Sequence, residues 1–196
     1  MPISDEQARR VKVAFNEAEI AISKVENLWD GFASPAVNEL RYAGYHLLEA
    51  QLGNDSEEQI KRAIRHCQRA RYDALDSGII YYLAEISDFK KEYDTVEIGP
   101  RVPNYPEIVK CARQAQAMLD EVRHKTNNRE EYYEAAEVCF QKLREACECL
   151  QDSSDEMKKA VRLHNRNVYR GWLAILLTAV GALAAVGALA ATGFFS

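Results

Sequence analysis

Residues 61–73, KRAIRHCQRARYD, crowd five basic side chains and one histidine into about three and a half helical turns. Guanidinium and ammonium groups bind phosphate oxygens, so this composition indicates a patch that could hold a nucleic acid. The candidate contacts are its arginines: Arg62, Arg65, Arg69 and Arg71. The favoured interpretation is a solvated helix face, because acidic residues in and beside the segment balance its charge: Glu57, Glu58, Asp73 and Asp76. Arg71 lies on the apolar stripe of its helix, so we expect it to pair with a buried carboxylate or to reach a partner chain.

Potential metal ligands show no spacing that predicts a metal or a cofactor, and neither is expected. The five cysteines form no CxxC pair, and Cys147 and Cys149 would point about 200° apart on a helix. We interpret them as reduced thiols that serve as small core residues. The sequence EVRH, Glu121 to His124, is an ExxH pair like those of di-iron bundles, but no second ExxH is present. A small-molecule substrate is not evident either.

The segments that would position these residues are helical, because apolar residues recur at steps of three and four along most of the chain. Ser34-Pro35 is a typical helix start, and the stretch 97–106 holds three prolines and one glycine, which predicts a loop. Strand-like alternation of any length is absent from the sequence. We therefore expect an all-α, antiparallel helical bundle over 1–152. Its predicted helices cover about 5–29, 34–52, 57–93, 105–124 and 129–150, with Ser56 as the N-cap of the third.

The C-terminal stretch predicts a single transmembrane helix over 171–196. No charged residue occurs from Gly171 to Phe195, about 25 residues against the roughly 20 that cross a bilayer. A basic juxtamembrane helix is expected over 153–170, with these cations: Lys158, Lys159, Arg162, Arg166 and Arg170. By the positive-inside rule the bundle would be cytosolic and the C-terminus outside the cytosol. These features predict a tail-anchored, single-pass protein bound to a lipid membrane.

Small residues follow one line along that predicted span, at steps of four, three, four, three and four. Small side chains let helices approach closely in lipid, and threonine hydroxyls can bond across the contact. The sequence therefore predicts that the chain packs against copies of itself as a homo-oligomer. The residues of this small-residue stripe are Ala174, Thr178, Gly181, Ala185, Ala188 and Thr192.

The stretch RYAGYH, Arg41 to His46, resembles the Arg-φ-x-x-x-His motif of HEPN domains, which are helical bundles that often dimerise and cut RNA. The resemblance implies that Arg41 and His46 stabilise the scissile phosphate and the attacking 2′-hydroxyl. On a continuous helix, however, the two side chains point about 140° apart. Tyr42 also stands where active members often carry a polar residue. The enzyme is therefore the alternative interpretation, and no catalytic residue is favoured.

A HEPN-like bundle joined to a membrane span is similar to the membrane accessory protein of Cas13b CRISPR systems. That resemblance implies an oligomer that forms or gates a membrane pore, as a prokaryotic antiviral effector linked to a nucleic-acid-sensing complex. One alternative is a membrane-tethered, HEPN-like ribonuclease that uses Arg41 and His46. Another is a membrane adaptor or fusion protein, with 129–150 as a zipper ahead of a C-terminal anchor.

Overall fold

The computed structural model describes residues 3–28, 34–53, 55–124 and 129–193. At 122–124, 129–133 and 184–193 it describes the backbone but not the side chains. Helices occupy most of these ranges, and no strand occurs within them, as the all-α prediction requires. The helices are α1 (Asp5–Glu26), α2 (Ser34–Gln51), α3 (Ser56–Glu92), α4 (Tyr105–His124), α5 (Arg129–Asp152) and α6 (Ser154–Gly193).

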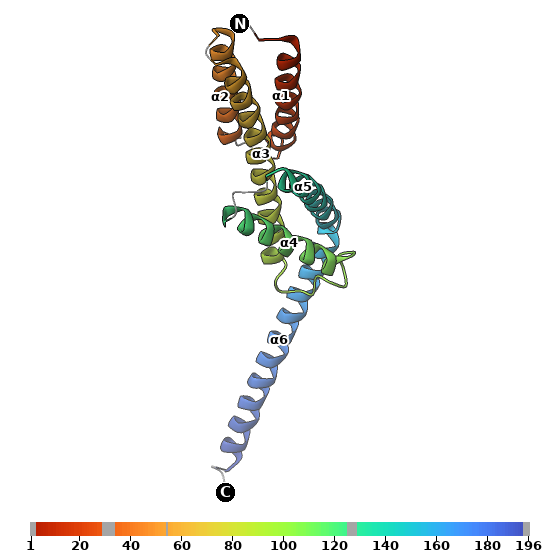
Figure 1. Ribbon diagram of the computed structural model, residues 1–196. Coiled ribbons are helices and arrows are strands. Elements are labelled where there is room, and N and C mark those ends of the chain that lie inside the picture. The colour runs from red at the N-terminus through yellow and green to blue at the C-terminus, as the bar shows by residue number, and fades with distance from the viewer. Residues whose placement is uncertain (1–2, 29–33, 54, 125–128, 194–196) are drawn as a thin grey trace.

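The long helix α3 is the centre of the fold (Figure 1). Its N-terminal half packs against α1 and α2, and its C-terminal half packs against α4 and α5. Helix α6 packs against α5 only at its start and then extends away from the other helices. The molecule is thus two short helical bundles that share one helix, followed by a projecting stem.

Local signals set the ends of these helices. Ser4 and Gln7 form a capping box at the start of α1: the Ser4 hydroxyl accepts from the Gln7 backbone N–H, and the Gln7 side chain accepts from the Ser4 N–H. The carboxylates of Asp5 and Glu6 lie in the first turn, where they complement the helix dipole. The predicted end of this helix at Trp29 lies outside the described residues.

Small side chains let the first three helices approach closely. Ala18, Ala43 and Ala74 are each 0% exposed and come from α1, α2 and α3. Gly78 makes the closest approach further along α3, since a Cβ there would lie 2.9 Å from Phe140 Cδ2 and 3.0 Å from Val25 Cγ2. Larger side chains fill the rest of the core, among them Leu75, Ile79, Leu143 and Met157.

The predicted boundary between the bundle over 1–152 and the basic helix over 153–170 is the junction of two helices. Helix α5 ends at Asp152, and α6 begins at Ser154. The Ser153 hydroxyl donates to the Cys149 carbonyl oxygen at 2.9 Å, and Met157 is fully buried one turn later. These contacts fix the start of α6 to the bundle.

The predicted transmembrane helix over 171–196 is wrong, and with it the tail anchor and the single-pass topology. In the part of the chain that the structure describes, no helix has both the length and the apolar composition that a membrane crossing needs. The charge-free stretch with described side chains runs from Gly171 to Leu183, about 20 Å of helix, whereas the hydrocarbon core measures about 30 Å. The preceding part of α6 is rich in Lys and Arg.

Candidate functional site

Arg41 and His46, the first and last residues of the RYAGYH motif, contact different partners. The Arg41 guanidinium lies 5.2 Å from the centroid of the Tyr42 ring, on the exposed side of α2. His46 is half-buried and faces α3, where its Nδ1 lies 2.6 Å from Oε1 of Gln59. The wide angle that the helical spacing predicts is therefore present, and the histidine belongs to the contact between α2 and α3.

A second histidine, which the sequence did not single out as a catalytic candidate, completes this site. The His66 ring stacks on the His46 ring, with centroids 5.1 Å apart and planes 16° apart. Its Nδ1 lies 2.6 Å from Oε2 of Glu39, and its ring lies 5.5 Å from that of Tyr42. We call Glu39, Tyr42, His46, Gln59 and His66 the histidine cluster. Only the packing of α2 on α3 brings these residues together, because His46 and His66 lie far apart along the chain.

The hydrogen bonds of the cluster select one tautomer for each ring. A carboxylate and an amide oxygen only accept, so Nδ1 of His66 and Nδ1 of His46 both donate. Each Nε2 then remains as the nitrogen that can exchange a proton with a ligand, as in general acid–base sites.

A nearby carboxyl group has a strongly altered proton affinity. Burial, reinforced by the negative charges of Glu39 and Asp76, raises the pKa of Asp73 from 3.8 to about 6. Asp73 lies about two helical turns after His66 on α3, and both groups have Glu39 as a neighbour.

Three of the four predicted phosphate contacts on α3 form ion pairs, and the charge of the fourth, Arg69, acts on the nearby Asp73 carboxyl group. Arg62 and Arg65 both bind Oε1 of Glu58, at 3.2 and 3.0 Å. Arg71 lies 3.4 Å from Glu17 on α1 and 3.9 Å from Glu137 on α5, so its partners are exposed or half-exposed carboxylates rather than the expected buried one. Arg69 forms no ion pair within the described residues and lies one turn after His66.

The projecting part of α6 exposes a continuous set of large apolar side chains, which we call the apolar stem. Every described side chain from Arg162 to Leu183 is exposed. The exposed fractions in the stem run from 45% to 73%. Its members are Leu163, Val168, Tyr169, Trp172, Leu173, Ile175, Leu176, Leu177, Val180 and Leu183.

The small-residue stripe lies on the same helix. The Thr178 hydroxyl donates to the Ala174 carbonyl oxygen at 2.8 Å, so it is satisfied within the helix. A Cβ added at Gly181 would meet open space. The side chains of Ala185, Ala188 and Thr192 lie outside the described set.

Metal and thiol chemistry receive no support from the geometry. Within the described part of the chain, no three His, Cys, Asp or Glu residues are grouped so that they could hold a metal ion. His124 of the EVRH sequence lies outside the described side chains. The cysteines are all free, and burial raises the pKa of the Cys67 and Cys139 thiols to about 11 and that of Cys147 to about 12.

Comparison with known proteins finds no matching family model, no matching curated protein and no matching solved structure. The resemblance to HEPN domains and to the Cas13b accessory protein therefore stays a prediction. The antiviral, ribonuclease and adaptor hypotheses also stay predictions.

Proposed function

We propose that this chain is a self-assembling helical protein whose copies associate through the apolar stem. The observation that carries the proposal is the set of ten large apolar side chains that α6 leaves exposed. Burying one side chain of this size contributes about 1.5–3 kcal/mol. Exposed apolar patches of this extent mark interaction surfaces.

A second copy of the chain is the occupant that fits this surface. Trp172, Leu176 and Leu183 fall on one side of α6 at steps of four and seven, the repeat by which two helices pack side by side. Two identical stems bury the same residues from both partners, which is the arrangement of symmetric dimers. The projection of α6 away from the bundle leaves room for that contact (Figure 1).

The test replaces one apolar side chain at the centre of the stem by a charge. Leu176→Lys should dissociate the assembly in analytical ultracentrifugation, because the ammonium group would be buried between the helices. The matched control is Leu48→Lys on α2, since Leu48 is 66% exposed and Leu176 is 59% exposed. The control should assemble like the parent protein. A monomeric parent protein, or capture of the parent by lipid vesicles without any oligomer in their absence, would refute the proposal.

The histidine cluster favours a second candidate function, cleavage of single-stranded RNA. The two stacked rings each hold Nδ1 in a hydrogen bond and keep Nε2 for proton exchange. His46 would take the proton of the 2′-hydroxyl, and protonated His66 would give a proton to the departing 5′-oxygen. The products would be a 2′,3′-cyclic phosphate and a 5′-hydroxyl. Arg41 and Arg69 would contact the phosphate.

Single substitutions separate this candidate from self-assembly. His46→Ala and His66→Ala should each abolish RNA cleavage and leave the sedimentation of the assembly unchanged. His164→Ala is the control, because His164 is exposed on α6 away from the cluster. RNA that stays intact with the parent protein would rule out the second candidate and leave the first standing.

A further inference from the structure

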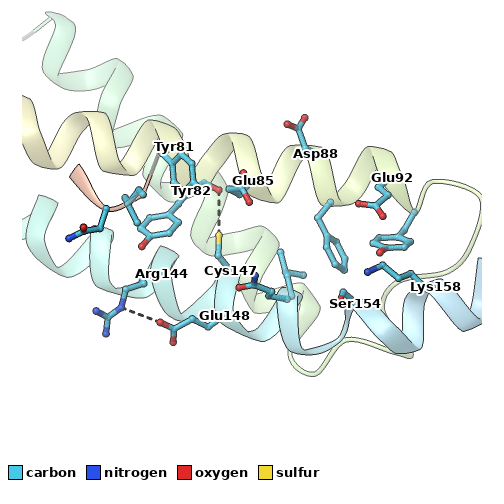
Figure 2. A pocket seen from close by; sticks show the side chains of 16 residues that line it. Tyr81, Tyr82, Glu85, Asp88, Glu92, Arg144, Cys147, Glu148, Ser154 and Lys158 are labelled. Carbon is cyan, nitrogen blue, oxygen red and sulfur yellow. Dashed lines mark hydrogen bonds and ion pairs between the residues drawn. The ribbon is translucent and has the colours of Figure 1, made fainter. Parts of the chain in front are cut away.

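A cleft of about 570 Å³ lies where the C-terminal half of α3 faces α5 and the start of α6 (Figure 2). Its lining on α3 is a ladder of aromatic and acidic side chains at helical spacing. The aromatic members are Tyr81, Tyr82, Phe89 and Tyr93, and the acidic members are Glu85, Asp88 and Glu92. Glu148 on α5 also lines the cleft, and its carboxylate is turned toward Arg144 on the same helix (Figure 2). Neither the histidine cluster nor the apolar stem contributes to this cleft.

The cleft carries a surplus of negative charge. Four carboxylates line it against two cations, Arg144 and Lys158. The Arg144 guanidinium is occupied by Glu148 at 3.4 Å. Asp88 binds Lys91 at 2.8 Å, but both side chains are at least 70% exposed, so this pair is weak. Glu85 has no ion pair and no hydrogen bond within the described residues.

The Tyr82 side chain in the same cleft carries a hydroxyl that has no hydrogen-bond partner among the described residues. Tyr82 is 6% exposed, and its ring lies 5.4 Å from that of Phe140. Figure 2 shows its hydroxyl pointing from α3 toward α5, into the cleft. The hydroxyl forms no hydrogen bond within the described part of the chain. Every fully buried side-chain polar atom in that part has a partner, so the Tyr82 hydroxyl must be accessible to a ligand in the cleft. Burial raises the pKa of Tyr82, which keeps this group a neutral hydroxyl.

We propose that this cleft binds an aliphatic polyamine. Glu85 and Glu92 lie seven residues apart, about 10.5 Å along α3, whereas the Asp88 carboxylate points away from the cleft (Figure 2). A polyamine carries ammonium groups separated by short methylene chains, which suits that spacing. Aromatic rings stabilise cations over their faces and cover the methylene groups. The Tyr82 hydroxyl accepts a hydrogen bond from one ammonium group.

The same residues fit an organic cation better than a metal ion. The described residues hold no grouping of three ligands for a metal, because the carboxylates are spread along the helix rather than gathered at one point. The aromatic wall would add nothing to metal binding.

Lys158 lines the cleft from α6 and repels any cationic ligand.

The experiment is isothermal titration of the full chain with spermidine as the probe. Glu85→Gln should weaken binding about tenfold through the loss of one charge interaction in a partly buried site. Tyr82→Phe should weaken it about threefold to tenfold through the loss of one hydrogen bond. Lys158→Met should tighten it about threefold or more, because it removes a competing positive charge.

The control variant is Glu19→Gln, which removes one exposed carboxylate on α1. It should leave the affinity unchanged, and all variants should keep the circular dichroism of the parent protein. Equal weakening by Glu19→Gln and Glu85→Gln would refute the proposal, because it would mean diffuse attraction to an acidic protein. Displacement of spermidine by an equal concentration of Mg²⁺ would refute it as well.

Discussion

Gly78 allows the clearest test of how α3 packs against α5, because a Gly78→Ala substitution has two effects on stability of opposite sign. Gly78→Ala gains about 0.5–1 kcal/mol of helix propensity. The new methyl group, however, would lie 2.9 Å from Phe140 Cδ2, closer still to Cε2, and 3.0 Å from Val25 Cγ2. Phe140 is 2% exposed and has little room to move, and overpacking of this kind costs about 1–3 kcal/mol. The expected net loss of stability is about 1–2 kcal/mol.

Urea unfolding followed by circular dichroism at one fixed protein concentration measures that loss. The matched control is Gly44→Ala, since a Cβ at this helical glycine meets nothing within 4 Å. The control should stabilise the protein by about 0.5–1 kcal/mol. In a Phe140→Leu background, Gly78→Ala should cost about 1 kcal/mol less than in the parent protein. If Gly78→Ala were as stable as Gly44→Ala, the close approach of α3 to α5 would be wrong.

Two further predictions concern groups whose pKa values the fold raises. Asp73 has a folded pKa of about 6, above its ordinary 3.8, so the stabilising effect of its neutral form is full below about pH 3.8 and is lost as the pH rises through 6. At pH 8 the Asp73→Asn variant should therefore be more stable than the parent protein by about 1–2 kcal/mol, after allowance for partial exposure. Urea unfolding should show that this difference in the free energy of unfolding vanishes near pH 4. A difference that stays constant with pH would contradict the burial of Asp73. Burial raises the pKa of the Cys147 thiol to about 12, so a thiol reagent at pH 8 should modify Cys147 at least about tenfold more slowly in the folded chain than in urea. The Cys147→Ser variant shows which part of the reaction belongs to Cys147. Equal rates would contradict the fold around α5.

Helix positions were largely predictable from the sequence, because a helix is specified by neighbours three and four residues apart and by its end signals. The stretch 97–106 was expected as a loop, and the structure has one there that ends where α4 begins at Tyr105. The expected helix over 105–124 has the bounds of α4. The prediction of a membrane span was wrong, and it was based on the composition of the C-terminal stretch alone.

Contacts between helices were decided only by the tertiary structure. His46 and His66 meet because small alanines on α2 and α3 set the distance and the relative shift of two helices, and no local pattern encodes that shift. Arg71 finds Glu17 and Glu137 for the same reason. The cleft needs Tyr82 from α3 and Glu148 from α5, whose separation in space depends on the packing of Gly78 against Phe140. Side-chain interdigitation between helices is a long-range property, so the sequence specified the helices and only their packing created the sites.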